Sequence, residues 1–188
     1  MVLMQDKKTV NMMFRDIIKN AVRWDESLCL RIFNWNGKRA GDRTMRIFSR
    51  IGDGHLYGVI AAALLIFNLN VGRFILQAAS FAFAFQISLQ KLMKHNIRRQ
   101  RPCHTISGIR NLVNLPDEFS FPSGHTAGAF IMAVLFSHLY SAFTYPLYVL
   151  ASLVGFSRVY NGVHYPSDVI FGAGLGISCG YLSLSLLL

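Results

Sequence analysis

Long blocks of apolar residues are the feature that most limits what this chain can fold into. Hydrophobic residues make up 53% of the 188 positions, whereas charged residues make up only 15%. A bilayer-spanning helix needs about 20 mostly apolar residues, and a helix pairs its backbone groups internally, as the hydrocarbon core requires. Five almost uncharged blocks cover residues 56–72, 74–90, 126–143, 145–156 and 169–188, with Arg73 between the first two. They predict an all-α, polytopic membrane helix bundle with five transmembrane helices.

The first 54 residues are basic and contain no clear membrane span. Apolar residues from Phe14 to Val22 recur at helical spacing with cations between them. We expect interfacial amphipathic helices with Trp24 and Trp35 at headgroup level and Asp25 as a helix cap. The alternative is an ordinary amphipathic helix packed on a neighbour. A sixth span arises only if part of residues 21–50 inserts.

The pattern therefore divides the chain into a basic interfacial region, residues 1–54, and a transmembrane domain, residues 55–188. The last apolar block carries Gly172, Gly176 and Gly180 at four-residue spacing. This spacing predicts a ridge of small residues for close helix packing. A nucleotide-binding loop would need a preceding strand, and the sequence indicates none.

The charge balance points to an anionic partner. The chain has 19 Lys and Arg residues against 9 acidic ones, a formal net charge of +10. Nucleic acid, anionic headgroups and phosphorylated substrates all fit such a balance. Since the apolar blocks commit the chain to a lipid bilayer, we expect a phosphorylated membrane lipid and no nucleic acid. The oligomeric state stays open.

Three polar clusters lie at the ends of the apolar blocks. Residues 94–102 follow the second block, residues 122–125 open the third, and residues 157–168 join the fourth to the fifth. Consecutive membrane helices alternate in direction. The three clusters therefore belong on one face of the membrane, where they can converge.

The cationic members of these clusters suit phosphoryl transfer. Lys94, Arg101 and Arg158 can surround a phosphate and balance the charge of its transition state. Ser123 and the amide of Gly124 stand at the start of a predicted helix, where free N–H groups and the helix dipole favour an anion. These five residues are the candidate phosphate-binding set.

Two histidines and one aspartate supply the remaining chemistry. The four-residue offset between His164 and Asp168 lets a carboxylate hold one imidazole, so that its other nitrogen is exposed as a nucleophile. His125 can then protonate the leaving oxygen. A lone histidine near a membrane surface is usually an ordinary polar residue, but each of these two belongs to a dense polar cluster at a helix start.

At this point the chain resembles the type 2 phosphatidic acid phosphatase superfamily over about residues 50–188. The three parts of that pattern, K-x6-RP, PSGH and SR-x5-H-x3-D, are all present. The resemblance implies that His164 is the nucleophile, that Asp168 orients it, and that His125 is the general acid and then the general base. It assigns phosphate binding to Lys94, Arg101, Ser123, Gly124 and Arg158. It also implies that neither a metal nor another cofactor is needed.

Other functions compete with a lipid phosphatase. The same architecture is similar to that of vanadium haloperoxidases, but those are larger, soluble proteins. A lipid-phosphate binding or translocating protein with a degenerate site is the second alternative, and intact His164 and Asp168 speak against it. The motifs leave the lipid open among isoprenoid diphosphates, phosphatidate, phosphatidylglycerol phosphate and lipid A.

The expected location is the bacterial cytoplasmic (inner) membrane, with the site near one of its faces. Cations favour the cytoplasmic face, because eleven of the 19 Lys and Arg residues precede Leu56 and seven more lie on the side of the polar clusters. The family resemblance favours the periplasmic face. The sequence leaves both possibilities open.

Overall fold

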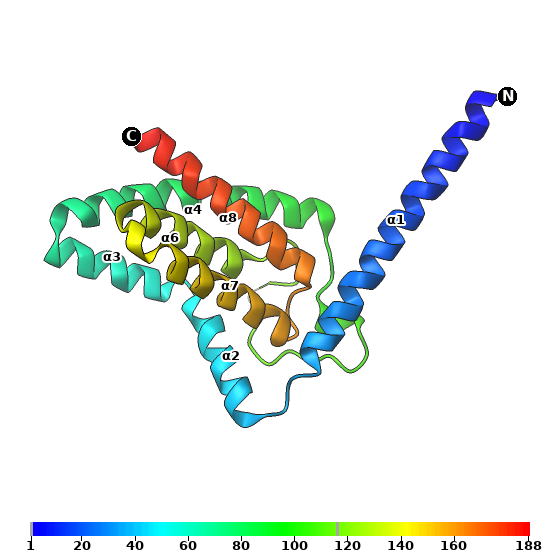
Figure 1. Ribbon diagram of the computed structural model, residues 1–188, viewed down its shortest axis with the longest axis horizontal. Helices are drawn as coiled ribbons and strands as arrows, with labels where there is room; N and C mark the ends of the chain where they lie inside the picture. Colours follow the sequence, from blue (N-terminus) through cyan, green and yellow to red (C-terminus); the bar gives the residue numbers. More distant parts are fainter. Residues whose placement is uncertain (1, 116) are drawn as a thin grey trace.

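The computed structural model describes residues 2–115 and 117–188 and is helical almost throughout (Figure 1). Among these residues there is no strand, only one isolated bridge between Gln100 and Phe119. The all-α prediction is confirmed. The helices are α1 (Val2–Phe33), α2 (Arg39–Ile51), α3 (His55–Phe67), α4 (Leu69–Ile97), α5 (Pro102–Thr105), α6 (Gly124–Leu139), α7 (Thr144–Tyr160) and α8 (Pro166–Leu187), with a 3-10 turn, η1 (Ser141–Phe143), before α7.

Helix α6 is the centre of the bundle. It packs against α4, α7 and α8, and every residue from Thr126 to Leu135 is buried. A helix that is apolar on all sides is stable only when neighbours cover it completely. The short sequence Gly124–Leu139 therefore forms the core, and the longer helices around it provide the outer surface.

The glycine ridge of α8 faces α6. A Cβ atom added to Gly172 would lie 2.5 Å from the carbonyl oxygen of Ser123, and one added to Gly176 would collide with the carbonyl oxygen of Ala127. Only glycine allows the two backbones to approach so closely. The prediction of close helix packing through small residues is confirmed for this pair.

Within the residues that the structure describes, three helical segments are long and apolar enough to cross a membrane: α4, Ser141–Tyr160 and α8. A fourth span results if α2 and α3, which are bent by 55° at the break between them, are taken together. Helix α6 is apolar but shorter. The surface of α8 exposes large apolar side chains such as Ile170 and Phe171, as lipid contact requires. The count of five spans stays a prediction.

The break between the first two apolar blocks lies at Asn68, not at Arg73 as the sequence pattern indicated. The side-chain oxygen of Asn68 accepts a hydrogen bond from the Val71 amide at 3.2 Å and so caps α4. Arg73 lies inside α4, within two turns of its start. Its long side chain can extend toward the membrane surface from there, so the charge does not end the helix.

Helix α1 runs without interruption from Val2 to Phe33 and leaves the bundle at an angle (Figure 1). Asp25 lies in its interior, so the prediction that Asp25 caps a helix is wrong. Near the end of α1, Cys29 and Phe33 are buried against the bundle. Trp24 and Trp35 are exposed. The side chain of Phe14 lies outside the described part, and the interfacial position of this region stays a prediction.

Candidate active site

The structure brings the three polar clusters together at one end of the bundle. Helix α4 ends there and α6 starts there, and the turn between α7 and α8 completes the site (Figure 1). Helix α2 lies at the same end and packs against α7. Consecutive helices of the bundle alternate in direction, which is why ends far apart in the sequence meet.

His164 stands in the short turn between α7 and α8. Gly162 allows this turn, because it has φ +73° and its added Cβ would lie 2.6 Å from the carbonyl oxygen of Arg110. The imidazole of His164 is only 2% exposed. Its Nδ1 lies 3.6 Å from Oδ2 of Asp168, and its Nε2 lies 3.4 Å from Nη1 of Arg101. One side of the ring therefore faces a carboxylate and the other a guanidinium.

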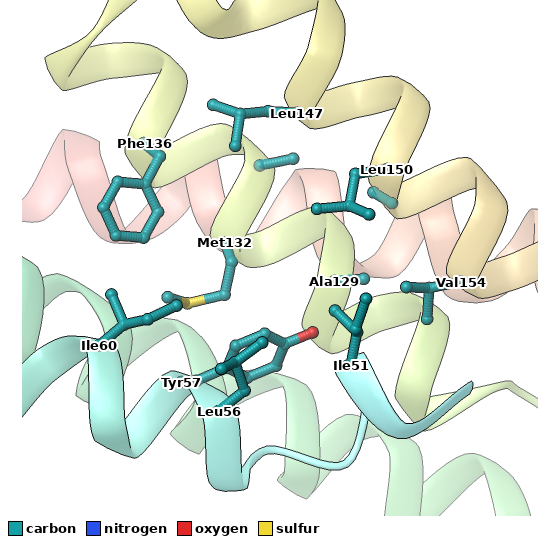
Figure 2. Close-up of a pocket in the computed structure, with 12 residues that line it drawn as sticks. Ile51, Leu56, Tyr57, Ile60, Ala129, Met132, Phe136, Leu147, Leu150 and Val154 are labelled. Atoms are coloured by element: carbon teal, nitrogen blue, oxygen red, sulfur yellow. The ribbon is translucent and has the colours of Figure 1, made fainter. Parts of the chain in front are cut away.

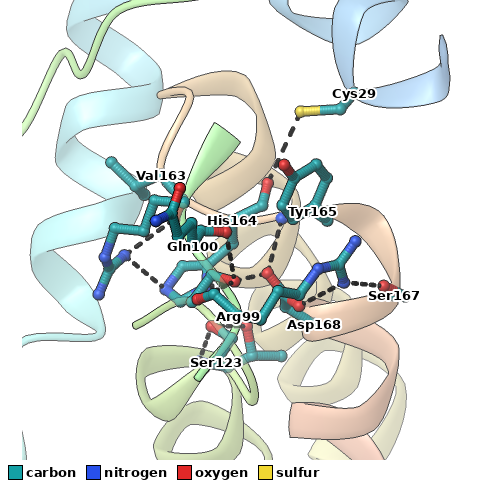
Figure 3. Close-up of polar contacts among 12 residues, drawn as sticks. Cys29, Arg99, Gln100, Ser123, Val163, His164, Tyr165, Ser167 and Asp168 are labelled. Atoms are coloured by element: carbon teal, nitrogen blue, oxygen red, sulfur yellow. Dashed lines mark hydrogen bonds and ion pairs between the residues drawn. The ribbon is translucent and has the colours of Figure 1, made fainter. Parts of the chain in front are cut away.

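Asp168 is held rigidly at the start of α8 (Figure 3). The backbone N–H of Tyr165, the residue before the helix, donates to Oδ2 of Asp168 at 2.9 Å. Arg99 donates to Oδ1 at 2.8 Å. The carboxylate is fully buried. Its orientation toward His164 is thus fixed by the helix start and by one cation.

Arg99 connects the site to α1. Its Nη2 donates to Asp25 at 2.6 Å, and its guanidinium lies 3.7 Å above the ring centre of Tyr165. Asp25 also accepts a hydrogen bond from the Ser167 amide at 2.9 Å, a tertiary contact that gives a partner to a free N–H in the first turn of α8. The sequence pattern gives no indication of a role for Arg99 or of this contact of Asp25. Nothing in the spacing of Asp25, more than 70 residues upstream, indicates the contact.

The surroundings of His164 favour its neutral form. Burial is the largest cause that lowers its pKa below the ordinary value, and the charges of Arg158 and Arg101 act in the same direction. The negative charge of the nearby Asp168 carboxylate raises this pKa but does not outweigh burial. A neutral imidazole keeps a lone pair, as a nucleophile must.

The start of α6 is arranged as an anion site. Ser123 caps the helix, and its hydroxyl lies 2.8 Å from that of Thr126. The first N–H groups of a helix have no partner within the helix. An added Cβ at Gly124 would lie 2.6 Å from the side-chain nitrogen of Gln90, so a larger residue would not fit. The Ser123 amide donates to the Asp168 carbonyl at 3.0 Å, which ties α6 to α8.

His125 is paired with an aspartate that the sequence analysis did not identify. Its Nε2 lies 2.8 Å from Oδ1 of Asp53, in the turn between α2 and α3. Gly52 packs directly on this histidine, since an added Cβ would lie 3.1 Å from the Cβ of His125. The one available signal was weak: Asp53 is an acidic residue in a glycine-flanked turn just before an apolar block.

Lys94 and Arg101 converge on the carboxylate of Asp117. The Lys94 ammonium lies 2.5 Å from Oδ2 and the Arg101 guanidinium lies 2.7 Å from Oδ1. Burial by itself raises the pKa of Asp117, but the hydrogen bonds and charges of Lys94 and Arg101 outweigh it and lower this pKa. Lys94 and Arg101, two of the predicted phosphate ligands, thus both contact the carboxylate of Asp117.

Arg158 is the most isolated cation of the site. Its side chain is 1% exposed, and Nη1 donates to the hydroxyl of Ser49 on α2. Within the described residues, neither Nε nor Nη2 of Arg158 has a hydrogen-bond partner. A buried guanidinium with two unpaired donors is costly unless an anion completes it. Neither the site nor any other part of the described ranges groups three His, Cys, Asp or Glu side chains that could hold a metal ion.

Comparisons with known proteins agree with this geometry. The sequence profile of the PAP2 superfamily matches residues 75–187, which include all three polar clusters. An undecaprenyl-diphosphatase of Sulfolobus acidocaldarius is 31% identical over 83% of this chain and 75% of its own length. The crystal structure of Aquifex aeolicus LpxE has a TM-score of 0.74 at 30% identity and covers 85% of this chain and 93% of that one. A PAP2-type phosphatidylglycerolphosphate phosphatase from Bacillus subtilis has a TM-score of 0.70 at 26% identity. The match covers 89% of this chain and 86% of that one.

Proposed function

This chain belongs to the PAP2 superfamily, and we propose that it is an integral-membrane lipid phosphatase that works through a phosphohistidine intermediate. Its substrate is a phosphate monoester or diphosphate of a membrane lipid, a proposal supported by the names of the undecaprenyl-diphosphatase and the phosphatidylglycerolphosphate phosphatase. The observation that carries the mechanism is the position of His164. This buried imidazole lies between a fixed carboxylate, Asp168, and a phosphate-binding cation, Arg101.

The first chemical step forms the intermediate. Asp168 orients the His164 ring through Nδ1, and Nε2 attacks the phosphorus atom. The bond between phosphorus and the leaving oxygen breaks, and His125 gives that oxygen a proton. Asp53 holds the ring of His125 during this transfer.

The second step releases phosphate. Water attacks the phosphorus of phosphohistidine, His125 accepts the proton of the water, and the phosphorus–nitrogen bond breaks. Lys94, Arg101 and Arg158 stabilise the charge that develops on the phosphoryl oxygens in both steps. Ser123 and the Gly124 amide bind the same oxygens at the positive end of α6. When the substrate phosphate binds, Lys94 and Arg101 leave the carboxylate of Asp117 and contact the phosphate oxygens instead.

An apolar cavity offers a place for the lipid tail (Figure 2). It is about 90 Å³ in volume and lies between α3, α6 and α7, with Tyr57, Met132 and Val154 among the lining residues. Val154 also packs on Gly52, which in turn packs on His125. We place the first carbons of the tail here, because the lining is apolar and Val154 lies against Gly52, which lies against His125.

The test is removal of the nucleophile. His164→Ala should lower phosphatase activity on a lipid phosphate by at least about 100-fold, since one preorganised catalytic group contributes that much. With ³²P-labelled substrate, the wild-type protein should carry an acid-labile phosphate label that His164→Ala lacks. His104→Ala is the matched control, because His104 is exposed and outside the site. Near wild-type activity in His164→Ala would disprove the assignment.

A further inference from the structure

A polar cavity opens beside Arg158, and apart from Arg158 its lining residues lie outside the motifs of the superfamily pattern. It has a volume of about 290 Å³ and lies between α2, the segment 112–114 and the end of α7. Its lining residues are Arg46, Ser49, Arg50, Asp53, Leu112, Val113, Asn114 and Arg158. Neither the proposed mechanism nor the sequence motifs assign a role to Arg46 and Arg50.

The charges of this cavity favour an anion. Arg46, Arg50 and Arg158 contribute three cations, and the one carboxylate, Asp53, is already paired with His125. Arg46 uses its Nε for the carbonyl oxygen of Asp42 on its own helix, which leaves its terminal nitrogens for a ligand. The Nε and Nη2 atoms of the buried Arg158 have no partner within the described residues, so its guanidinium can lie between the transferred phosphoryl group and an anion in this cavity. An anion in the cavity would satisfy donors that are otherwise unpaired.

The position of the cavity relates it to the leaving group. Arg158, on one side, belongs to the set that binds the transferred phosphoryl group. Asp53, also in its lining, holds His125, which protonates the leaving oxygen. A group in this cavity is therefore next to the bond that breaks, on the side that departs with the lipid.

We propose that this cavity binds a second phosphate, carried by the leaving group of the substrate. This inference rests on the proposed function and narrows its substrate class. The substrate is then either a lipid diphosphate or a lipid whose terminal phosphate monoester is followed by a phosphodiester. The terminal phosphoryl group goes to His164, and the second phosphate leaves with the tail. When a lipid with a single phosphate, such as phosphatidate, is bound, the cavity holds no anion.

Two pairs of lipids with matched tails test the proposal in detergent micelles. The first pair is farnesyl diphosphate and farnesyl phosphate, and the second is phosphatidylglycerol phosphate and phosphatidate. The wild-type protein should have a higher kcat/KM for the member with two phosphates in at least one pair. A preference within the farnesyl pair identifies the second phosphate as part of a diphosphate. A preference for phosphatidylglycerol phosphate over phosphatidate identifies it as a phosphodiester.

The double variant Arg46→Gln with Arg50→Gln should reduce that preference by about tenfold or more, because it removes two charge-assisted contacts. The control is Arg39→Gln with Arg43→Gln, which removes two exposed arginines of the same helix that do not line the cavity. Absence of a preference in the wild-type protein would overturn the proposal, and so would an equal loss on both members of a pair. Inactivity toward all four lipids would instead refute the proposed function.

Discussion

At the scale of single residues, the two imidazoles of the site have different carboxylate partners. Asp168 is fully buried and held by a helix start and by Arg99. Asp53 is 42% exposed and stands in a turn between two helices. His164, the proposed nucleophile, thus has a rigid partner, whereas Asp53, the partner of the proposed proton donor His125, lines the polar cavity beside Arg158.

Asp53→Asn should lower kcat by about tenfold or more with little change in KM, because general acid–base catalysis contributes about 100-fold or more and depends on the orientation of His125. It should also shift the alkaline limb of the pH–rate profile, since the charge next to His125 is lost. Steady-state kinetics over a range of pH measure both effects. Asp16→Asn, an exposed carboxylate on α1, serves as the control. A lower kcat with an unchanged pH profile would indicate a structural role only.

The acidic limb of the pH–rate profile should lie well below pH 6.5. The neutral form of His164 is the nucleophile in the proposed mechanism, and burial lowers its pKa below the ordinary value of about 6.5. At a pH between that lowered value and 6.5 the imidazole still lacks its proton, so activity persists there and is lost only as the pH falls through the lowered pKa. Rates of single-turnover phosphorylation measure this step directly. A rate that halves near pH 6.5 would contradict the expected direction.

Sequence spacing identified the motif residues of the site but not their partners. The offset of four between His164 and Asp168 is visible in the sequence because one helix start contains both. Asp53 and Asp117 contact His125 and Arg101 only because the bundle brings separate segments together. Such tertiary pairs carry no period or fixed spacing, so a single sequence cannot reveal them.

At the scale of helices, the contact between α6 and α8 sets the geometry of the site. Ser123, at the start of α6, and Asp168, in the first turn of α8, are joined by a backbone hydrogen bond of 3.0 Å. The glycines of α8 hold the rest of the two helices close together. A change in helix separation would therefore move Ser123, a proposed phosphate ligand, relative to Asp168, which orients the nucleophile in the proposed mechanism.

Gly176→Ala should destabilise the protein by about 1–3 kcal/mol, because its methyl group would collide with the backbone of Ala127 in a packed interior. Gly174→Ala is the matched control on the same helix, since nothing lies within 4 Å of its added Cβ. That control should be neutral or more stable by about 0.5–1 kcal/mol, as helix propensity predicts. Thermal unfolding in detergent measures both. Equal Tm values for the two variants would exclude the close-packing role.

The apolar blocks predicted where helices form better than where they end. Four of the five blocks fall within α4, α6, α7 and α8 or extend at most a turn beyond them. The errors have local causes: Asn68 caps a helix that the charge of Arg73 does not interrupt, and Asp25 serves a tertiary contact instead of a cap. The position of a cap depends on which side chain reaches a free amide, and hydropathy does not contain that information.

At the scale of the whole molecule, the distribution of cations relates the site to the membrane. Among the Lys and Arg residues of the described part of the bundle, residues 55–115 and 117–188, only Arg73 lies near the end opposite the site. The C-terminus lies at that opposite end (Figure 1). Even without the three candidate phosphate ligands, Lys94, Arg101 and Arg158, a large excess of cations remains on the side of the site.

We propose on this basis that the site faces the cytoplasm, since cytoplasmic loops carry the excess of Lys and Arg. The test uses a background without cysteine and single cysteines at two exposed positions, Ser107→Cys near the site and Leu188→Cys at the opposite end. A membrane-impermeant thiol reagent on intact cells should label the second position and not the first. Permeabilised cells, in which both should react, control for accessibility. The reverse pattern would place the site on the periplasmic face, as the family resemblance suggests, and would show that catalytic demand for cations outweighs the topology rule here.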